Sequence, residues 1–74
     1  MSKYLLTALV QREEGSWAAL CPELDVASQG ETIEQAKENL REAVELFLKS
    51  AGKSEIKQRL HKESYLSSME VEVG

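Results

Sequence analysis

The chain has 74 residues, a formal net charge of −4 and a single cysteine. A chain of this length forms one domain, residues 1–74, and buries only about 60% of its unfolded surface, so partners or self-association often add stability. The acidic balance disfavours autonomous nucleic-acid binding and favours a basic partner. No apolar run approaches the roughly 18 residues of a membrane span, and a lone cysteine fits a reducing compartment, so we expect a cytoplasmic protein.

Three short strands are predicted in the first 30 residues. Residues 4–12 are rich in strand formers and apolar on both faces, as in a central strand. The polar turn at residues 13–16 separates them from a second strand, residues 17–21, which ends at Pro22 because proline lacks an N–H. Residues 26–29 form a short third strand. Strands this close in sequence predict an antiparallel meander.

Residues 33–51 carry the apolar spacing of an amphipathic helix, in steps of three and four. Thr32 can cap this helix, and Gln35 can complete a capping box. Gly52 is well placed to end it. A second, shorter helix is predicted over residues 55–62, anchored by Ile56 and Leu60.

The last residues have the period of a strand. Met69, Val71 and Val73 alternate with two glutamates, and the strand can begin as early as Tyr65. The helical crossover is long enough to place it parallel to the first strand with a right-handed connection. The predicted fold is α+β, in the order β-β-β-α-(α)-β, with a four-stranded mixed sheet of order 3-2-1-4 and the long helix packed on one face. The uncovered face is a candidate interface.

The order of motifs resembles the HicB-like antitoxin family. That family has an aromatic strand, a Pro-(Asp/Glu)-Leu turn, a small-residue strand, and Gly-(Asp/Glu)-Thr opening a helix rich in Glu-Ala and Leu. The matching elements here are Trp17, Pro22-Glu23-Leu24, Ala27-Ser28-Gln29, Gly30-Glu31-Thr32 and the helix through Arg41-Glu42-Ala43. The resemblance covers residues 4–49 well, and residues 69–73 are compatible with the family's last strand. The resemblance rests on the order and spacing of these motifs taken together.

The resemblance implies a partial ribonuclease H-like fold and a partner, the HicA-type toxin. That toxin is a small basic mRNA-cleaving protein whose active site the antitoxin shields. Two departures stand out: Asp25-Val26 replaces the Pro-Gly of many members, and no DNA-binding segment follows before Gly74. We expect a non-catalytic antitoxin. The alternative is a stand-alone regulatory module of the same fold. In either case we expect a homodimer or higher homo-oligomer, without direct nucleic-acid or membrane binding.

Catalytic and metal-binding patterns are weak. A third hypothesis, an acid-dependent nuclease, needs carboxylates that converge on two metal ions, one of them from the first strand. Residues 4–11 carry no acid, and Glu13, Glu23 and Asp25 are scattered over a turn and a loop. His61 is the only histidine and lies in a polar stretch, so a solvated side chain is favoured over a ligand. Cys21 is more typical of a small core residue than of a reactive thiol. We expect no enzymatic activity, metal or cofactor.

Partner contact is predicted at Trp17 and at the loop made by Pro22, Glu23, Leu24 and Asp25. A tryptophan near a hairpin is more often a core residue than an interface anchor. Glu23 and Asp25 would meet a basic toxin, although such loop charges are most often simply solvated. A second acidic strip follows one flank of the long helix: Glu34, Glu38 and Glu42. That spacing is usual for a solvated face and only secondarily for a docking surface.

Overall fold

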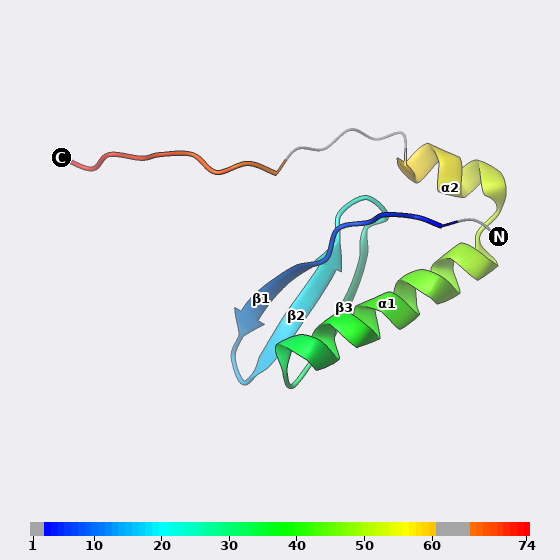
Figure 1. Ribbon diagram of the computed structural model, residues 1–74, viewed down its shortest axis with the longest axis horizontal. Helices are drawn as coiled ribbons and strands as arrows, with labels where there is room; N and C mark the ends of the chain where they lie inside the picture. Colours follow the sequence, from blue (N-terminus) through cyan, green and yellow to red (C-terminus); the bar gives the residue numbers. More distant parts are fainter. Residues whose placement is uncertain (1–2, 61–65) are drawn as a thin grey trace.

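The computed structural model describes residues 3–60 and 66–74 of the chain. Three strands and two helices follow one another: β1 (Leu9–Glu13), β2 (Ser16–Cys21), β3 (Val26–Gly30), α1 (Ile33–Ser50) and α2 (Lys53–Leu60) (Figure 1). The strands form an antiparallel sheet in the order β1-β2-β3. α1 lies along one face of this sheet and packs mainly on β3 and β2, so that β1 is the least covered strand. The fold is α+β with two layers, and the predicted meander is present.

The β1–β2 hairpin begins the fold. Glu13 pairs with Ser16, which leaves a two-residue turn, and Gly15 there has a φ of +71°, in the left-handed region that glycine enters without strain. At the other end Leu9 pairs with Leu20. β1 therefore starts five residues later than predicted, because β2 ends at Cys21 and offers residues 4–7 no backbone partner.

The loop after β2 turns one side chain into the core. The N–H of Leu24 donates to the carbonyl oxygen of Cys21 at 3.3 Å, and Asp25 follows with a positive φ of 55°. This geometry directs Leu24 inward, where it is fully buried. It joins a small core of apolar side chains from β2, this loop and α1: Ala19, Cys21, Leu24, Ala36 and Leu40.

The start of α1 is fixed by a cap and by close packing. The N–H of Gln35 donates to the Thr32 hydroxyl oxygen at 3.0 Å, and the Gln35 side-chain oxygen accepts from the N–H of Glu31 at 2.6 Å. This confirms the predicted cap at Thr32, with Gln35 reaching back one residue further than in the standard box. Gly30 lies so near α1 that an added Cβ would come within 2.5 Å of the Ala36 nitrogen.

The end of α1 leads directly into α2. The last turn closes with the N–H of Ala51 donating to the Phe47 carbonyl at 2.8 Å, one residue before the predicted stop at Gly52. α2 begins two residues before its predicted start at residue 55, and residues 61–62 of that prediction lie outside the described residues. The Arg59 guanidinium donates to the Leu24 carbonyl and sits 4.7 Å from the centroid of the Phe47 ring. These contacts hold α2 against the loop and against the end of α1.

The predicted fourth strand is wrong. Residues 66–74 form no strand and lead away from the sheet (Figure 1). Met69, Val71 and Val73 are 85%, 67% and 93% exposed. Their alternation supplies the period of a strand, but a strand also needs a neighbouring backbone, and these residues have none in the described chain. The sheet is three-stranded, in the order β1-β2-β3, and not a four-stranded sheet of order 3-2-1-4. The proposed start at Tyr65 lies outside the described residues.

Candidate protein-binding surface

The residues predicted to contact a partner lie at two ends of β2. Trp17 stands at its beginning, and the Pro22–Asp25 loop follows Cys21 at its end. Trp17 and Cys21 are four positions apart along the strand, which corresponds to about 13 Å. The structure therefore does not gather these residues into one site.

Glu23 is engaged within the chain. Its carboxylate accepts hydrogen bonds from the Thr7 N–H at 3.0 and 3.1 Å, from the Thr7 hydroxyl at 2.7 Å and from the Cys21 thiol at 3.5 Å. Partial burial acts to raise the pKa of Glu23, but the hydrogen bonds from Thr7 outweigh it, so the pKa lies below its ordinary value. Glu23 thus ties the N-terminal segment to the loop.

The other predicted contact residues differ in how accessible they are. Pro22 and Asp25 are exposed, while the Leu24 side chain is fully buried and belongs to the core of the domain. Trp17 is half-buried against the core, with the Arg12 guanidinium 5.3 Å from the centroid of its ring. Pro22 and Asp25 remain as the surface of the loop.

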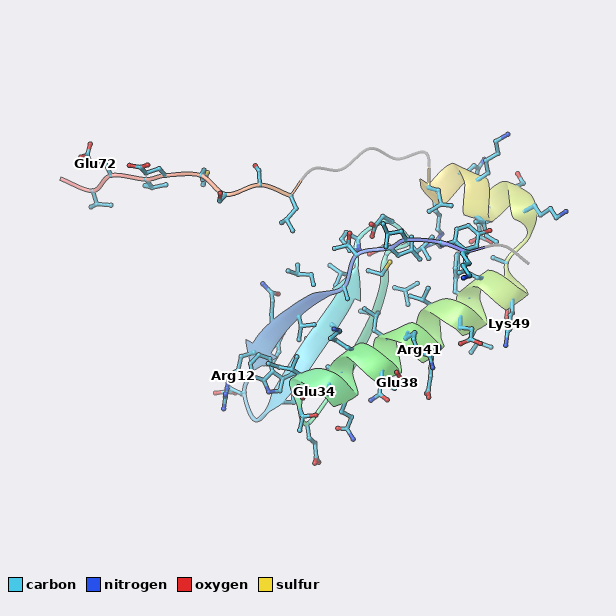
Figure 2. All side chains as sticks on the ribbon, in the orientation of Figure 1. Arg12, Glu34, Glu38, Arg41, Lys49 and Glu72 are labelled. Carbon is cyan, nitrogen blue, oxygen red and sulfur yellow. The ribbon has the colours of Figure 1, made fainter. Side chains whose placement is uncertain are left out.

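A groove of about 620 Å³ runs between residues 4–8 and the exposed flank of α1. It exists because α1 covers β2 and β3 but hardly reaches β1. Its apolar wall consists of α1 side chains that face the sheet: Leu40, Val44 and Leu48. Its rim carries charged side chains of the same helix: Glu34, Lys37, Glu38, Arg41 and Glu45. Figure 2 shows Glu34, Glu38 and Arg41 following one another along α1, with Lys49 further on.

Ion pairs neutralise part of this rim. The Arg41 guanidinium lies 2.6 Å from the Glu38 carboxylate and 3.1 Å from that of Glu45, whose second oxygen is 3.2 Å from the Lys49 amine. Hydrogen bonding to Glu38 raises the pKa of Arg41, and the same contact lowers the pKa of Glu38. All these groups are exposed, so each pair contributes little stability. Within the described residues, the ion pairs leave Glu34 and Glu42 as unpaired carboxylates of the predicted strip.

The described residues offer binding groups rather than a metal site. Across residues 3–60 and 66–74, no three His, Cys, Asp or Glu side chains lie close enough together to hold a metal ion. His61, which the sequence favours as a solvated side chain, lies outside the described residues. Cys21 is 1% exposed, and desolvation by burial raises the pKa of its thiol, which keeps it protonated at neutral pH. Neither described helix is long and apolar enough to cross a membrane.

Comparison with known proteins places the chain in a family. A UPF0150 protein of Helicobacter pylori is 31% identical over 68 residues, which span 90% of this chain and 94% of that protein. The chain belongs to the UPF0150 family. Two further UPF0150 proteins, both of Synechocystis sp., are 43% identical over 49 residues and 42% identical over 45 residues. These matches span 64% and 58% of the chain and only 62% of each relative. No family model and no solved structure matches it.

Two residues that shape this UPF0150 surface escaped the sequence analysis. Thr7 anchors Glu23 across 16 positions, and Arg59 reaches the Leu24 carbonyl across 35. Neither residue belongs to a local motif, and hydrogen bonds over such separations leave no periodic pattern in one sequence. Arg41 could have been found, because its i−3 and i+4 neighbours on the helix are both glutamates.

Proposed function

We propose that this UPF0150 protein is a non-catalytic binding protein of the HicB antitoxin type. It neutralises a small, basic, mRNA-cleaving HicA-type toxin by covering the active site of that toxin. The proposal rests on the ordered motifs from Trp17 to the Arg41-Glu42-Ala43 segment of α1, which resemble those of the HicB-like antitoxins. The observation that carries it is the groove along α1, because its apolar wall and the unpaired carboxylate of Glu34 on its rim, among the described residues, suit a basic protein surface.

The structure changes which carboxylates we assign to the contact. Glu23 is occupied by Thr7, and Glu38 by Arg41, so both have their main partners inside the chain. Glu34 on the rim and Glu42 one turn beyond Glu38 are exposed and form no ion pair within the described part. Basic side chains of the toxin would meet these two carboxylates first, with Asp25 as an outlying contact on the loop. The apolar wall of the groove would then exclude water from the contact.

The alternative function is a homo-oligomeric regulatory module of the same fold with no toxin partner. The edge of β1, which has no partner strand among the described residues, and the exposed apolar side chains of residues 66–74 favour it, because both features promote association between copies. Under this alternative the charged rim of α1 is a solvated face and does not contribute to the binding of a basic toxin.

The test uses a HicA-type toxin and an RNA-cleavage assay. Adding the UPF0150 protein at equal concentration should abolish cleavage, and the association rate should fall as salt rises. The double variant E34Q/E42Q should slow association several-fold at low salt with little change in shape. The matched control, E70Q/E72Q, removes two charges from the tail and should associate like the wild type.

Two outcomes would contradict the proposal. Full cleavage in the presence of excess wild-type protein would mean that the active site is not covered. Equal association rates for E34Q/E42Q and E70Q/E72Q across a salt series would mean that the α1 rim is not the contact. If the association rates are equal but E34Q/E42Q still inhibits cleavage, the antitoxin function stands and the contact lies on a surface other than the α1 rim.

A further inference from the structure

The open edge of the sheet is the first observation behind this inference. In a two-residue hairpin, every second residue of β1 directs its backbone N–H and C=O away from β2. This edge covers residues 8–13, about 20 Å of extended chain, whereas residues 4–7 turn towards the loop after β2, where the Thr7 N–H donates to Glu23 (Figure 1). Natural proteins usually cover, charge or shorten such an edge. Here the described chain leaves it uncovered.

The tail, residues 66–74, has the side-chain pattern of a strand that could pair with such an edge. Met69, Val71 and Val73 share one side of an extended chain, and Ser68, Glu70 and Glu72 share the other. All nine residues are exposed. Extended, they span about 30 Å, which is long enough to pair along the whole of β1. The tail therefore has the pattern of a strand with one buried side and one solvated side, without the sheet that would bury it.

The groove beside the edge fits the apolar side of such a strand. Side chains at Ala8 and Val10 face α1, because Val10 packs against the core and residues on one face of a strand alternate. A strand added along this edge would direct alternate side chains into the same layer, against Leu40, Val44 and Leu48. The opposite side chains, Glu70 and Glu72, would then point to solvent, as their charge requires.

We propose that two copies of this chain exchange their tails, so that residues 66–74 of each copy add a strand to the β1 edge of the other. Within residues 3–60 and 66–74 of one copy, both the edge and the tail are unpaired, and reciprocal exchange would pair both under two-fold symmetry. Each pairing supplies main-chain hydrogen bonds along the edge and fills the groove with the three apolar side chains of the tail. This inference does not depend on a toxin partner, and because the tail and a toxin would occupy the same groove, tail exchange and toxin binding would exclude each other there.

The test compares variants that differ in which side of the tail they alter. Sedimentation of the full chain at high micromolar concentration should show a dimer, twice 8.3 kDa. V71E places a charge on the apolar side and should weaken dimerisation at least tenfold. S68E adds the same charge on the solvated side and should dimerise like the wild type. Circular dichroism of both variants should show the same folded spectrum as the wild type.

A second pair of variants tests the β1 edge. A mixture of an edge variant with a tail variant then tests whether edge and tail pair with each other. A8P removes an edge N–H and should be monomeric, whereas A8S keeps that N–H and should dimerise. An equimolar mixture of A8P and V71E should form a heterodimer, because A8P still has a competent tail and V71E a competent edge. Pairing through the uncovered sheet face would instead leave V71E and A8P as stable dimers.

Several outcomes would overturn the exchange. A wild-type chain that sediments only as an 8.3 kDa monomer has no partner copy. A V71E dimer as stable as that of S68E would show that the apolar side of the tail is not buried. Two monomeric single variants whose mixture forms no heterodimer would show that tail and edge do not meet. Should A8P fail to fold, the comparison of V71E with S68E still decides the proposal.

Discussion

Two segments of this protein have the same alternating pattern and opposite fates. Trp17, Ala19 and Cys21 alternate along β2, and the last two are each only 1% exposed. Met69 and Val73 alternate along the tail in the same way and remain almost fully exposed. β2 has a strand on either side and α1 across its face, whereas the described chain provides the tail with neither. An alternating pattern therefore gives a segment one apolar side. That side is buried only where a neighbouring strand or helix covers it.

The body of the protein, residues 3–60, also has contacts that specify its geometry, and none of these contacts involves the tail within the described part of the chain. Gly30 lets β3 approach α1, Thr32 caps the helix, and Glu23 ties the N-terminal segment to the loop. Arg59 holds α2 against that same loop. Substitutions in the body should therefore change stability strongly, and matched substitutions outside it should not.

Leu24→Ala should have the largest effect. Leu24 is fully buried, and truncating a buried leucine costs about 2–5 kcal/mol through lost burial and the cavity that remains. Leu66→Ala in the tail removes the same atoms from a side chain that is 78% exposed and should change stability by less than about 0.5 kcal/mol. Urea unfolding, followed at a concentration where the protein is monomeric, measures both. Equal losses in the free energy of unfolding for the two variants would contradict the distinction between body and tail.

Gly30→Ala should come next. The added Cβ would lie 2.5 Å from the Ala36 nitrogen and 2.8 Å from the Gln35 carbonyl carbon, and both are backbone atoms that move only if α1 moves. Overpacking of this kind costs about 1–3 kcal/mol. Gly52→Ala is the control, because a Cβ there meets nothing within 4 Å. Thermal melts of the two variants should differ clearly, and matching midpoints would mean that β3 and α1 are less closely packed than described.

Thr32→Ala tests the start of α1. Removing the hydroxyl that accepts from the Gln35 N–H should cost about 1 kcal/mol. Thr32→Ser keeps that oxygen and should retain nearly all of the stability. Chemical denaturation provides the comparison. A serine variant as unstable as the alanine variant would attribute the effect to the lost methyl group and not to the cap.

Glu23→Gln should have the smallest effect on stability, and the size of that effect should depend on pH. The Thr7 hydrogen bonds favour the ionised carboxylate, so its folded pKa lies below the ordinary 4.5. The resulting stabilisation is present above about pH 4.5 and is lost as pH falls through the lower, folded pKa. The wild type should exceed Glu23→Gln by less than about 1 kcal/mol at neutral pH, since the site is partly solvated. Unfolding measured between pH 7 and pH 3 should show this difference shrinking, and a constant difference would contradict the assignment.

Local patterns predicted most of the body from the sequence. The apolar spacing of residues 33–51 and the cap at Thr32 located α1 to within one residue, because both signals act within a few positions of the chain. Pro22 and the polar turn at residues 13–16 marked the ends of β2 to within one residue for the same reason. The first strand was predicted too long, since its length is set by where β2 stops and not by its own composition.

Long-range contacts account for what the sequence analysis missed. The fourth strand was predicted from its own period, although its existence depends on an edge that another segment must share. Glu23 looked like a free surface charge because its partner, Thr7, is 16 residues away. Leu24 looked like part of an exposed loop because nothing local reveals that Asp25 turns the backbone to a positive φ. The groove along α1 likewise follows from how the helix lies over the sheet.

The rate at which the Cys21 thiol is labelled can measure how often the core opens. This thiol is enclosed by the core and kept protonated by burial, so a thiol reagent can react only after the core has opened. Cys21 is also the sole cysteine of the chain, which means that every labelled molecule records an opening at the same place. The labelling rate, compared with that of the unfolded chain, therefore reports how often the body opens under native conditions, without a denaturant and without an added probe.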